Sequence, residues 1–357
     1  MSKKLKPQPK LSVAKRQPPR WQHERNLTLV VWIVIPLVIA LALGLVGYWG
    51  YNTYVAAWTQ PIAKIGNETI GNATAGNVTK GNVTVLDMRY YVKMLRYYSL
   101  AQQGNISSAS YPYQVLQQIE NNVLVRQAAP GLGIQVTPDE VTQRITDTMI
   151  SLAGGGGNTT GNVTGDIAQP QTELGKIYQQ WLNYVRLSDS EYRQVVEDLL
   201  LTQKLSDQIT QSVPTEGKQV HLYAILVSSE GNATEVEQLL QNGEDFATVA
   251  MEFSMDETSR QNGGELGWLP QGILLSELDQ AAFSLAEGNV SEPIVSTNGY
   301  YIIKVAGIED RPIDDQYRQM LASTAFTNWF EEQRNIVEIK DYYLTQAKAT
   351  WAMNHIT

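Results

Sequence analysis

The residue types that most often carry out chemistry are scarce in this chain of 357 residues. It contains no cysteine, which excludes disulfides, thiolate nucleophiles and cysteine-ligated zinc or iron–sulfur sites. Its three histidines, His23, His221 and His355, are spread along the whole sequence, so a histidine-ligated metal site is not expected. We therefore expect no metal, no cofactor and no thiol chemistry.

Asparagine is the residue type whose spacing does suggest a chemical modification. The sequence contains ten Asn-x-Ser/Thr sequons, and nine of them follow residue 50, mostly in glycine-rich stretches. Such stretches form surface loops that a glycosyltransferase could reach, although Gly-Asn pairs also form ordinary turns. The candidate acceptors are Asn67, Asn72, Asn77, Asn82, Asn105, Asn158, Asn162, Asn232 and Asn289.

The charges divide the chain into a basic head and an acidic body. Residues 1–26 hold eight Lys or Arg and one acidic residue, whereas the whole chain has 27 basic and 36 acidic residues. The acidic body would repel a phosphate backbone, so nucleic acid is not an expected partner. The basic head suits a tail that lies against anionic lipid.

An uncharged segment of 23 residues, from Leu27 to Trp49, follows the head. It is long enough to cross a hydrocarbon core of about 30 Å, so we predict a single transmembrane helix over 27–50. A cleaved signal peptide is the alternative, but its apolar region is usually only about 7–15 residues long. The basic residues before the segment place 1–26 in the cytoplasm and the rest outside, in a single-pass cell-membrane protein.

Helical periodicity dominates the part of the chain that follows. A strand–turn–strand pattern at 61–70 comes first, and helices are predicted at 86–100, 112–128, 138–152, 171–184 and 188–211. With glycine- and asparagine-rich insertions at 71–85 and 154–166, they would form a mainly helical domain over 51–213. Pro214 to Gly217 then breaks the pattern.

Strands and helices alternate after this break. The sequence predicts strands at 218–227 and 299–305, and helices at 233–241, 244–253 and 278–285. They would form a compact domain over 218–310. The remaining segment, 311–357, returns to a helical pattern and is expected to pack on the helical domain.

Residues 218–308 resemble the parvulin-type peptidyl-prolyl isomerase domain. The resemblance rests on the blocks D-F-A…A…S (Asp245 to Ser254), G-G-E-L-G-W (Gly263 to Trp268), A-A-F-x-L (Ala281 to Leu285), G-x-V-S-x-P (Gly288 to Pro293) and G-Y-x-I-I-K-V (Gly299 to Val305). The flanking segments at 61–70 and 188–205 are similar to the PrsA/SurA group of exported foldases and chaperones. The resemblance implies an α+β chain with a SurA-N-like helical domain and a small antiparallel sheet flanked by helices.

The resemblance also implies a pocket for a proline ring. It assigns substrate binding to Ala224, Leu266, Leu269, Leu274, Leu278 and Phe283, and roles beside the reacting peptide to Asp256, Asn298 and Tyr301. Core packing is the alternative role for the apolar side chains, and a solvated loop is the alternative for Asp256.

Both histidines of the family pattern are replaced in this chain, by Ala224 and Tyr301. His221 lies three residues before Ala224, an odd offset that places it on the opposite face of the strand unless a β-bulge intervenes. It is therefore a poor substitute for either histidine, whereas the Tyr301 hydroxyl can still donate a hydrogen bond.

Three functions fit these features. The first is an extracytoplasmic, membrane-anchored isomerase that acts on unfolded or nascent exported polypeptides with X-Pro bonds, which needs no cofactor because the barrier of about 18–20 kcal/mol is crossed by twisting one amide bond. The second is a catalytically weak or inactive chaperone of the same fold. The third is a glycosylated subunit of a membrane assembly.

Overall fold

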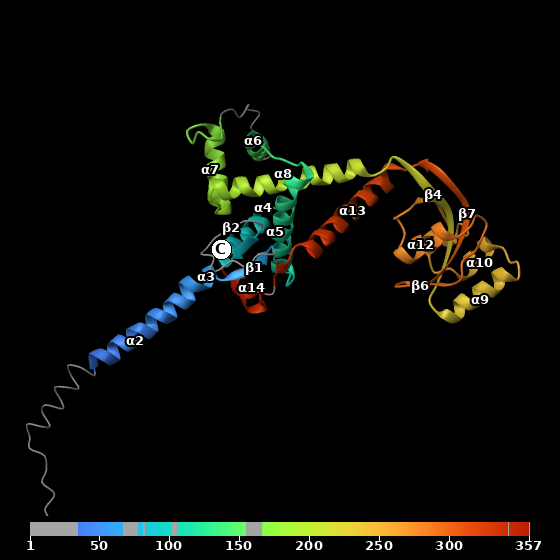
Figure 1. Cartoon of the computed structure of the whole chain (residues 1–357), viewed down its shortest axis with the longest axis horizontal. Helices are drawn as coiled ribbons and strands as arrows, with labels where there is room; N and C mark the ends of the chain where they lie inside the picture. Colours follow the sequence, from blue (N-terminus) through green and yellow to red (C-terminus); the bar gives the residue numbers. More distant parts are fainter. Residues whose placement is uncertain are drawn as a thin grey trace, which may run out of the picture.

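The structure, a computed structural model, describes residues 35–66, 78–80, 83–101, 106, 108–154, 166–341 and 343–356. Its first element, α2 (Ile35–Gly50), continues through a π-helical turn (Tyr51–Ala56) into α3 (Ala57–Thr59) and extends away from the other elements (Figure 1). Within the described residues, no helix combines the length and the apolar character needed to cross a membrane. Residues 27–34 of the predicted transmembrane helix lie outside the described residues.

Five helices form where the sequence predicts them, and they build the main core of the molecule. They are α4 (Met88–Ala101), α5 (Tyr111–Ala128), α6 (Pro138–Gly154), α7 (Glu173–Val185) and α8 (Asp189–Ser212). The start of α8 is fixed by a capping box, in which the Ser188 hydroxyl accepts from the Glu191 backbone N–H and the Glu191 carboxylate accepts from the Ser188 backbone N–H. Buried apolar side chains such as Tyr91, Leu95 and Leu124 fill the space between the helices.

A small antiparallel sheet completes this core in the order β2-β3-β1-β8. Its strands are β1 (Pro61–Ile65), β2 (Val78–Lys80), β3 (Val83–Asp87) and β8 (Ile339–Lys340). The prediction of a helix from residue 86 was therefore wrong by two residues, because Asp87 ends β3 and its carboxylate accepts from the Tyr90 backbone N–H (2.9 Å).

Residues 216–312, called the inserted unit below, form a second antiparallel sheet in the order β5-β4-β7-β6. The strands are β4 (Glu216–Val227), β5 (Glu265–Pro270), β6 (Ile294–Ser296) and β7 (Gly299–Pro312). The connecting helices are α9 (Glu230–Gln241), α10 (Phe246–Phe253), α11 (Glu257–Arg260) and α12 (Ser276–Ser284). β7 is longer than predicted, because it remains paired with β4 as far as Pro312 opposite Glu216.

The chain then returns to the first core, so the described residues within 57–213 and 315–356 together form what we call the helical unit. α13 (Asp315–Ile336) leads back beside α8, and α14 (Gln346–Met353) ends near α3 (Figure 1). Phe330, Leu344 and Ala352 are buried in the same core as α4 and α5. The final segment is not wholly helical as predicted, because residues 311–312 belong to β7 and 339–340 pair with β1.

Candidate functional site

The predicted pocket residues come together on one face of the inserted sheet. Side chains alternate along β4, so Val220, Leu222 and Ala224 share a face with Tyr301 and Ile303 of β7. Leu278 and Ala282 of α12 cover this face and are themselves buried.

Seven of the predicted site residues belong to this one cluster. Ala224, Leu269 and Leu278 are buried, whereas the other four are only half-buried and thus within reach of a ligand. The seven are Ala224, Leu266, Leu269, Leu274, Leu278, Phe283 and Tyr301. Their gathering supplies an apolar surface with a single phenolic hydroxyl, and their binding roles stay a prediction.

Gly264, directly before β5, allows this strand to lie close enough to β4 to bring Leu266 into the cluster. Gly264 has φ +82°, and its carbonyl accepts a hydrogen bond from the Ala224 backbone N–H (2.8 Å). A Cβ atom at this position would lie 2.6 Å from the Ala224 carbonyl oxygen, so only glycine fits.

Asp256 lies outside the apolar cluster and caps a short helix. One carboxylate oxygen accepts from the Thr258 backbone N–H (3.2 Å), and the other accepts from the buried Ser259 hydroxyl (2.6 Å). The loop is held beside β4, because the Met255 backbone N–H donates to the Leu226 carbonyl (2.7 Å). The loop position is therefore fixed relative to Ala224, while the carboxylate itself is committed to α11.

Asn298 is an exposed residue in the turn between β6 and β7. Its backbone N–H donates to the Ser296 hydroxyl (3.1 Å), and its side chain is not part of the apolar cluster. Asp256 and Asn298 thus lie in loops at the ends of the pocket strands and are not members of the apolar cluster, and their catalytic roles also stay predictions.

His221 lies on the opposite face of the sheet, as the odd offset from Ala224 predicts. Its ring stacks on Trp268 at 5.2 Å, and its Nε2 lies 2.7 Å from Glu265. The bulge in the β4–β7 pairing lies beside His221, but β4 keeps its alternation on both sides of it.

Sequence reasoning missed Ile294, which packs against the pocket cluster from β6. A strand of three residues is too short to show the period of two by which strands are found. It also missed the Arg311 guanidinium, which lies 4.5 Å from the Trp268 ring centroid, because residue 311 was assigned to the final helical segment.

Two of the nine candidate glycan acceptors fall in the described part of the chain. Asn232 and Asn289 are both exposed. The remaining seven, Asn67, Asn72, Asn77, Asn82, Asn105, Asn158 and Asn162, lie outside the described residues. Across the described ranges, no group of three or more His, Asp or Glu side chains is placed to hold a metal ion.

The helical unit carries a second candidate surface, a groove of about 470 Å³ between α4, α5, α8 and α13. Tyr97, Tyr98 and Phe326 supply aromatic rings, and Gln118 and Asn122 supply amides. Burial raises the pKa of Tyr98 to about 12, so its hydroxyl, which accepts from the Asn122 amide (3.3 Å), stays neutral. Rings beside amides can contact both the side chains and the backbone of an unfolded segment.

Comparison with protein families gives two matches. Residues 226–307 match the PPIC-type PPIASE domain, and residues 22–153 match the SurA-like N-terminal domain. Curated relatives include the foldase protein PrsA of Caldanaerobacter subterraneus, which is 33% identical over 172 residues (44% of this chain and 54% of the relative). The PrsA foldase of Geobacillus kaustophilus is 34% identical over 151 residues, or 42% of this chain and 50% of the relative. The chain thus spans about half the length of these relatives.

Solved structures give similar matches. PrsA from Bacillus anthracis is 20% identical with a TM-score of 0.39, covering 68% of this chain and 94% of its own. The parvulin of Nitrosopumilus maritimus is 38% identical with a TM-score of 0.24, covering 26% of this chain and 98% of its own.

Proposed function

We propose that this chain, which carries a PPIC-type peptidyl-prolyl isomerase domain and a SurA-like N-terminal domain, is a membrane-anchored foldase. Its inserted unit would isomerise X-Pro bonds in exported polypeptides, and its helical unit would hold the unfolded segment. The observation that carries the proposal is that seven predicted site residues, three buried and four half-buried, form one cluster on one sheet face.

The cluster has the properties that the reaction needs. An X-Pro bond isomerises by losing amide resonance, so a catalyst must bind the twisted amide better than the planar one. Leucines that remove water from the proline ring weaken the solvation of the planar amide, and the Tyr301 hydroxyl is a donor beside it. No covalent intermediate is required.

Membrane anchoring is the second part of the proposal. The uncharged run from Leu27 to Trp49 and the eight basic residues before it favour a single span with the N-terminus in the cytoplasm. The described part of this run, α2, exposes its apolar side chains, for example 62% of Leu37 and 66% of Leu43. Lipid is the partner that would cover them.

Glycosylation is a third part, supported by the exposure of Asn232 and Asn289. An intact-mass measurement on protein from its native source would show added hexose masses if these sequons are used. A mass equal to that of the unmodified chain would exclude the modification.

A chaperone without turnover is the second candidate function. The replacement of both family histidines by Ala224 and Tyr301 favours it, and so does the groove of the helical unit. This candidate predicts that the protein delays aggregation of an unfolded client without accelerating X-Pro exchange.

The two candidates are separated by NMR exchange spectroscopy on Ala-Ala-Pro peptides with the full chain in an uncharged detergent. An isomerase makes the cis and trans forms of the peptides interconvert faster than they do without protein. Tyr301→Phe should then lower kcat/KM about five- to tenfold, the equivalent of about 1 kcal/mol for one lost hydrogen bond. Tyr223→Phe on the opposite face is the matched control and should keep the wild-type rate. No acceleration by a folded wild-type protein would overturn the isomerase proposal.

Asp256→Ala tests the loop beside β4. Because Asp256 caps α11, this variant should lose about 0.5–2 kcal/mol of stability as well as activity. Asp256→Asn keeps a capping side chain and removes only the charge. If both variants retain full kcat/KM, the predicted catalytic role of Asp256 is wrong.

A further inference from the structure

The negative charge of the protein is concentrated in the inserted unit. Its 97 residues hold 16 carboxylates and four Lys or Arg, a net charge of −12, whereas the whole chain has −9. Within the described part of the chain, only two of these carboxylates have a basic partner: Glu309 pairs with Arg311, and Glu265 contacts the His221 ring, which is charged only when protonated. The negative charges of the other 14 carboxylates are not neutralised by an ion pair among the described residues, so they can attract a cationic ligand.

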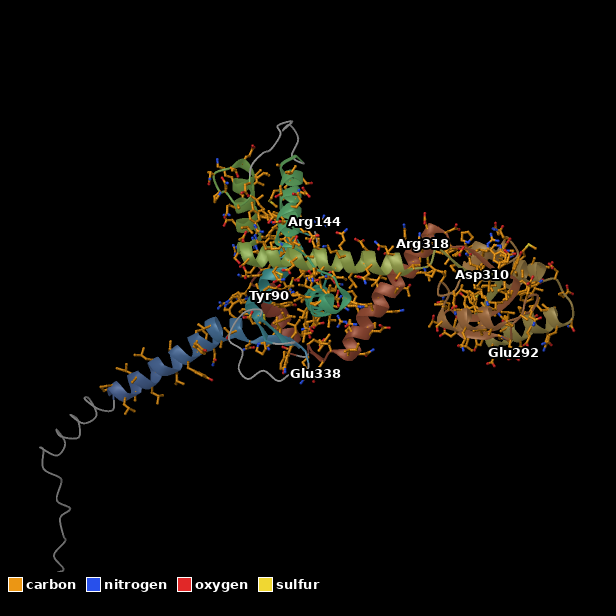
Figure 2. All side chains as sticks on the ribbon, turned by 45° about the horizontal axis from the view of Figure 1, so that its top comes forward. Tyr90, Arg144, Glu292, Asp310, Arg318 and Glu338 are labelled. Carbon is orange, nitrogen blue, oxygen red and sulfur yellow. The ribbon has the colours of Figure 1, made fainter. Side chains whose placement is uncertain are left out.

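Carboxylates also surround the pocket itself. Glu277 and Asp279 flank Leu278 on α12, and the exposed Glu292 lies two residues before Ile294, which packs on the pocket cluster. Figure 2 shows Glu292 on the inserted unit, at a distance from the helical unit. Asp256 and Glu257 add two more carboxylates at the start of α11.

Basic residues are nearly absent from this face. Arg260 is the only Lys or Arg on α11, α12, β5 and β6. Lys304 follows Ile303 on β7 and so lies on the other face by alternation, and Arg311 stacks on Trp268 there. Lys218 shares the face of Val220 by alternation but lies six residues before Ala224, beside Pro270 and Gln271. A phosphate or carboxylate next to proline would therefore meet more carboxylates than counter-charges at the pocket.

We propose that the inserted unit selects cationic X-Pro segments, with Lys or Arg beside the proline, and that Glu277 and Glu292 determine this specificity. The inference rests on the proposed isomerase function and names its substrate class. A surface field of one sign raises the local concentration of oppositely charged ligands and speeds their association. Salt weakens such attraction, because the Debye length falls from about 30 Å at 0.01 M to about 3 Å at 1 M.

The test compares Ala-Xaa-Pro-Ala peptides with Lys, Ala or Glu at Xaa, using NMR exchange with the full chain in an uncharged detergent. At 20 mM salt we expect kcat/KM for the Lys peptide to exceed that for the Glu peptide at least fivefold. At 500 mM salt the same ratio should be less than twofold. The Ala peptide reports on the isomerase activity alone.

Two double Glu→Gln variants identify the carboxylates that cause the preference for the Lys peptide. Glu277→Gln with Glu292→Gln should at least halve the Lys-to-Glu ratio at low salt. Glu235→Gln with Glu252→Gln removes the same charge from exposed positions on α9 and α10, which cover the other face, and should leave the ratio within a fifth of wild type.

The outcomes separate the two proposals. If the protein accelerates exchange of the Ala peptide but gives equal kcat/KM for the Lys and Glu peptides, charge selection is overturned and the isomerase proposal stands. Equal loss of preference in both double variants overturns the assignment to Glu277 and Glu292. Absence of exchange for every peptide overturns both proposals.

Discussion

The helical unit and the inserted unit place their charged groups in opposite ways. The helical unit buries three carboxylates, Asp87, Glu120 and Asp198, and two of these pair with arginines far away in the sequence. The inserted unit buries only uncharged polar residues, Gln219, Ser254, Ser259 and Ser291. Its carboxylates are all exposed or half-buried.

The difference follows from how each unit is assembled. The inserted unit is one continuous segment, and backbone pairing along the whole of β4 and β7 closes it. The helical unit joins two segments that are separated by the inserted unit. Its buried pair Glu120–Arg334 links α5 to α13 across 214 residues, which fixes how the returning helix docks. Charged side chains therefore help to join the two segments of the helical unit, whereas in the inserted unit they remain accessible to solvent and ligands.

The largest effect is expected for the buried pair between Arg126 and Asp198. The Arg126 Nη2 lies 2.6 Å from the Asp198 carboxylate, which is only 2% exposed. Arg126→Met would leave this buried carboxylate without its charged partner, with only the Gln194 amide still donating to it (3.3 Å), and should lower the free energy of unfolding by about 3–5 kcal/mol. Urea unfolding followed by circular dichroism measures it.

The matched control is Glu309→Gln, which removes an exposed pair from the inserted unit and should cost at most about 1 kcal/mol. The double variant Arg126→Met with Asp198→Leu should recover most of the lost stability. A loss below 1 kcal/mol in Arg126→Met would show that the pair does not hold the helical unit together.

A smaller effect is expected from the titration of Glu120. Burial raises its pKa to about 7, while Arg334 at 3.3 Å acts in the opposite direction. In the unfolded chain this carboxyl ionises near 4.5, so between these values the folded protein binds one more proton than the unfolded protein. Stability should therefore fall by up to about 3 kcal/mol as the pH rises from 4.5 to 7, and then level off.

Comparing urea unfolding of the wild type and Glu120→Gln at pH 5 and pH 7.5 isolates this contribution. The variant should lose less stability than the wild type over the same interval, because its side chain does not titrate. Identical pH dependence of the two proteins would mean that Glu120 ionises at its usual pKa in the folded state.

The smallest effect is expected at a surface carboxylate of the inserted unit. Glu252→Gln on α10 should change the free energy of unfolding by no more than about 0.5 kcal/mol, in the stabilising direction, because it reduces repulsion among like charges. Thermal unfolding at low and high salt measures this, and the gain should shrink at high salt. A clear destabilisation would show that the charge has a structural partner.

The sequence by itself determined the elements that carry a local signal. Helical spacing and the Ser188–Glu191 capping box located the long helices, and strand alternation placed Ala224 and His221 on opposite faces. These features depend on residues a few positions apart, so a single sequence contains them. The resemblance supplied the pocket residues, and seven of them do lie in one cluster.

Only the tertiary structure decided the features that depend on distant residues. β8 is two residues long and exists because β1, more than 270 residues earlier in the chain, offers it an edge. The Glu120–Arg334 pair joins segments on either side of the inserted unit, 214 residues apart, and such a contact forms only once the returning helix has packed on the helical unit.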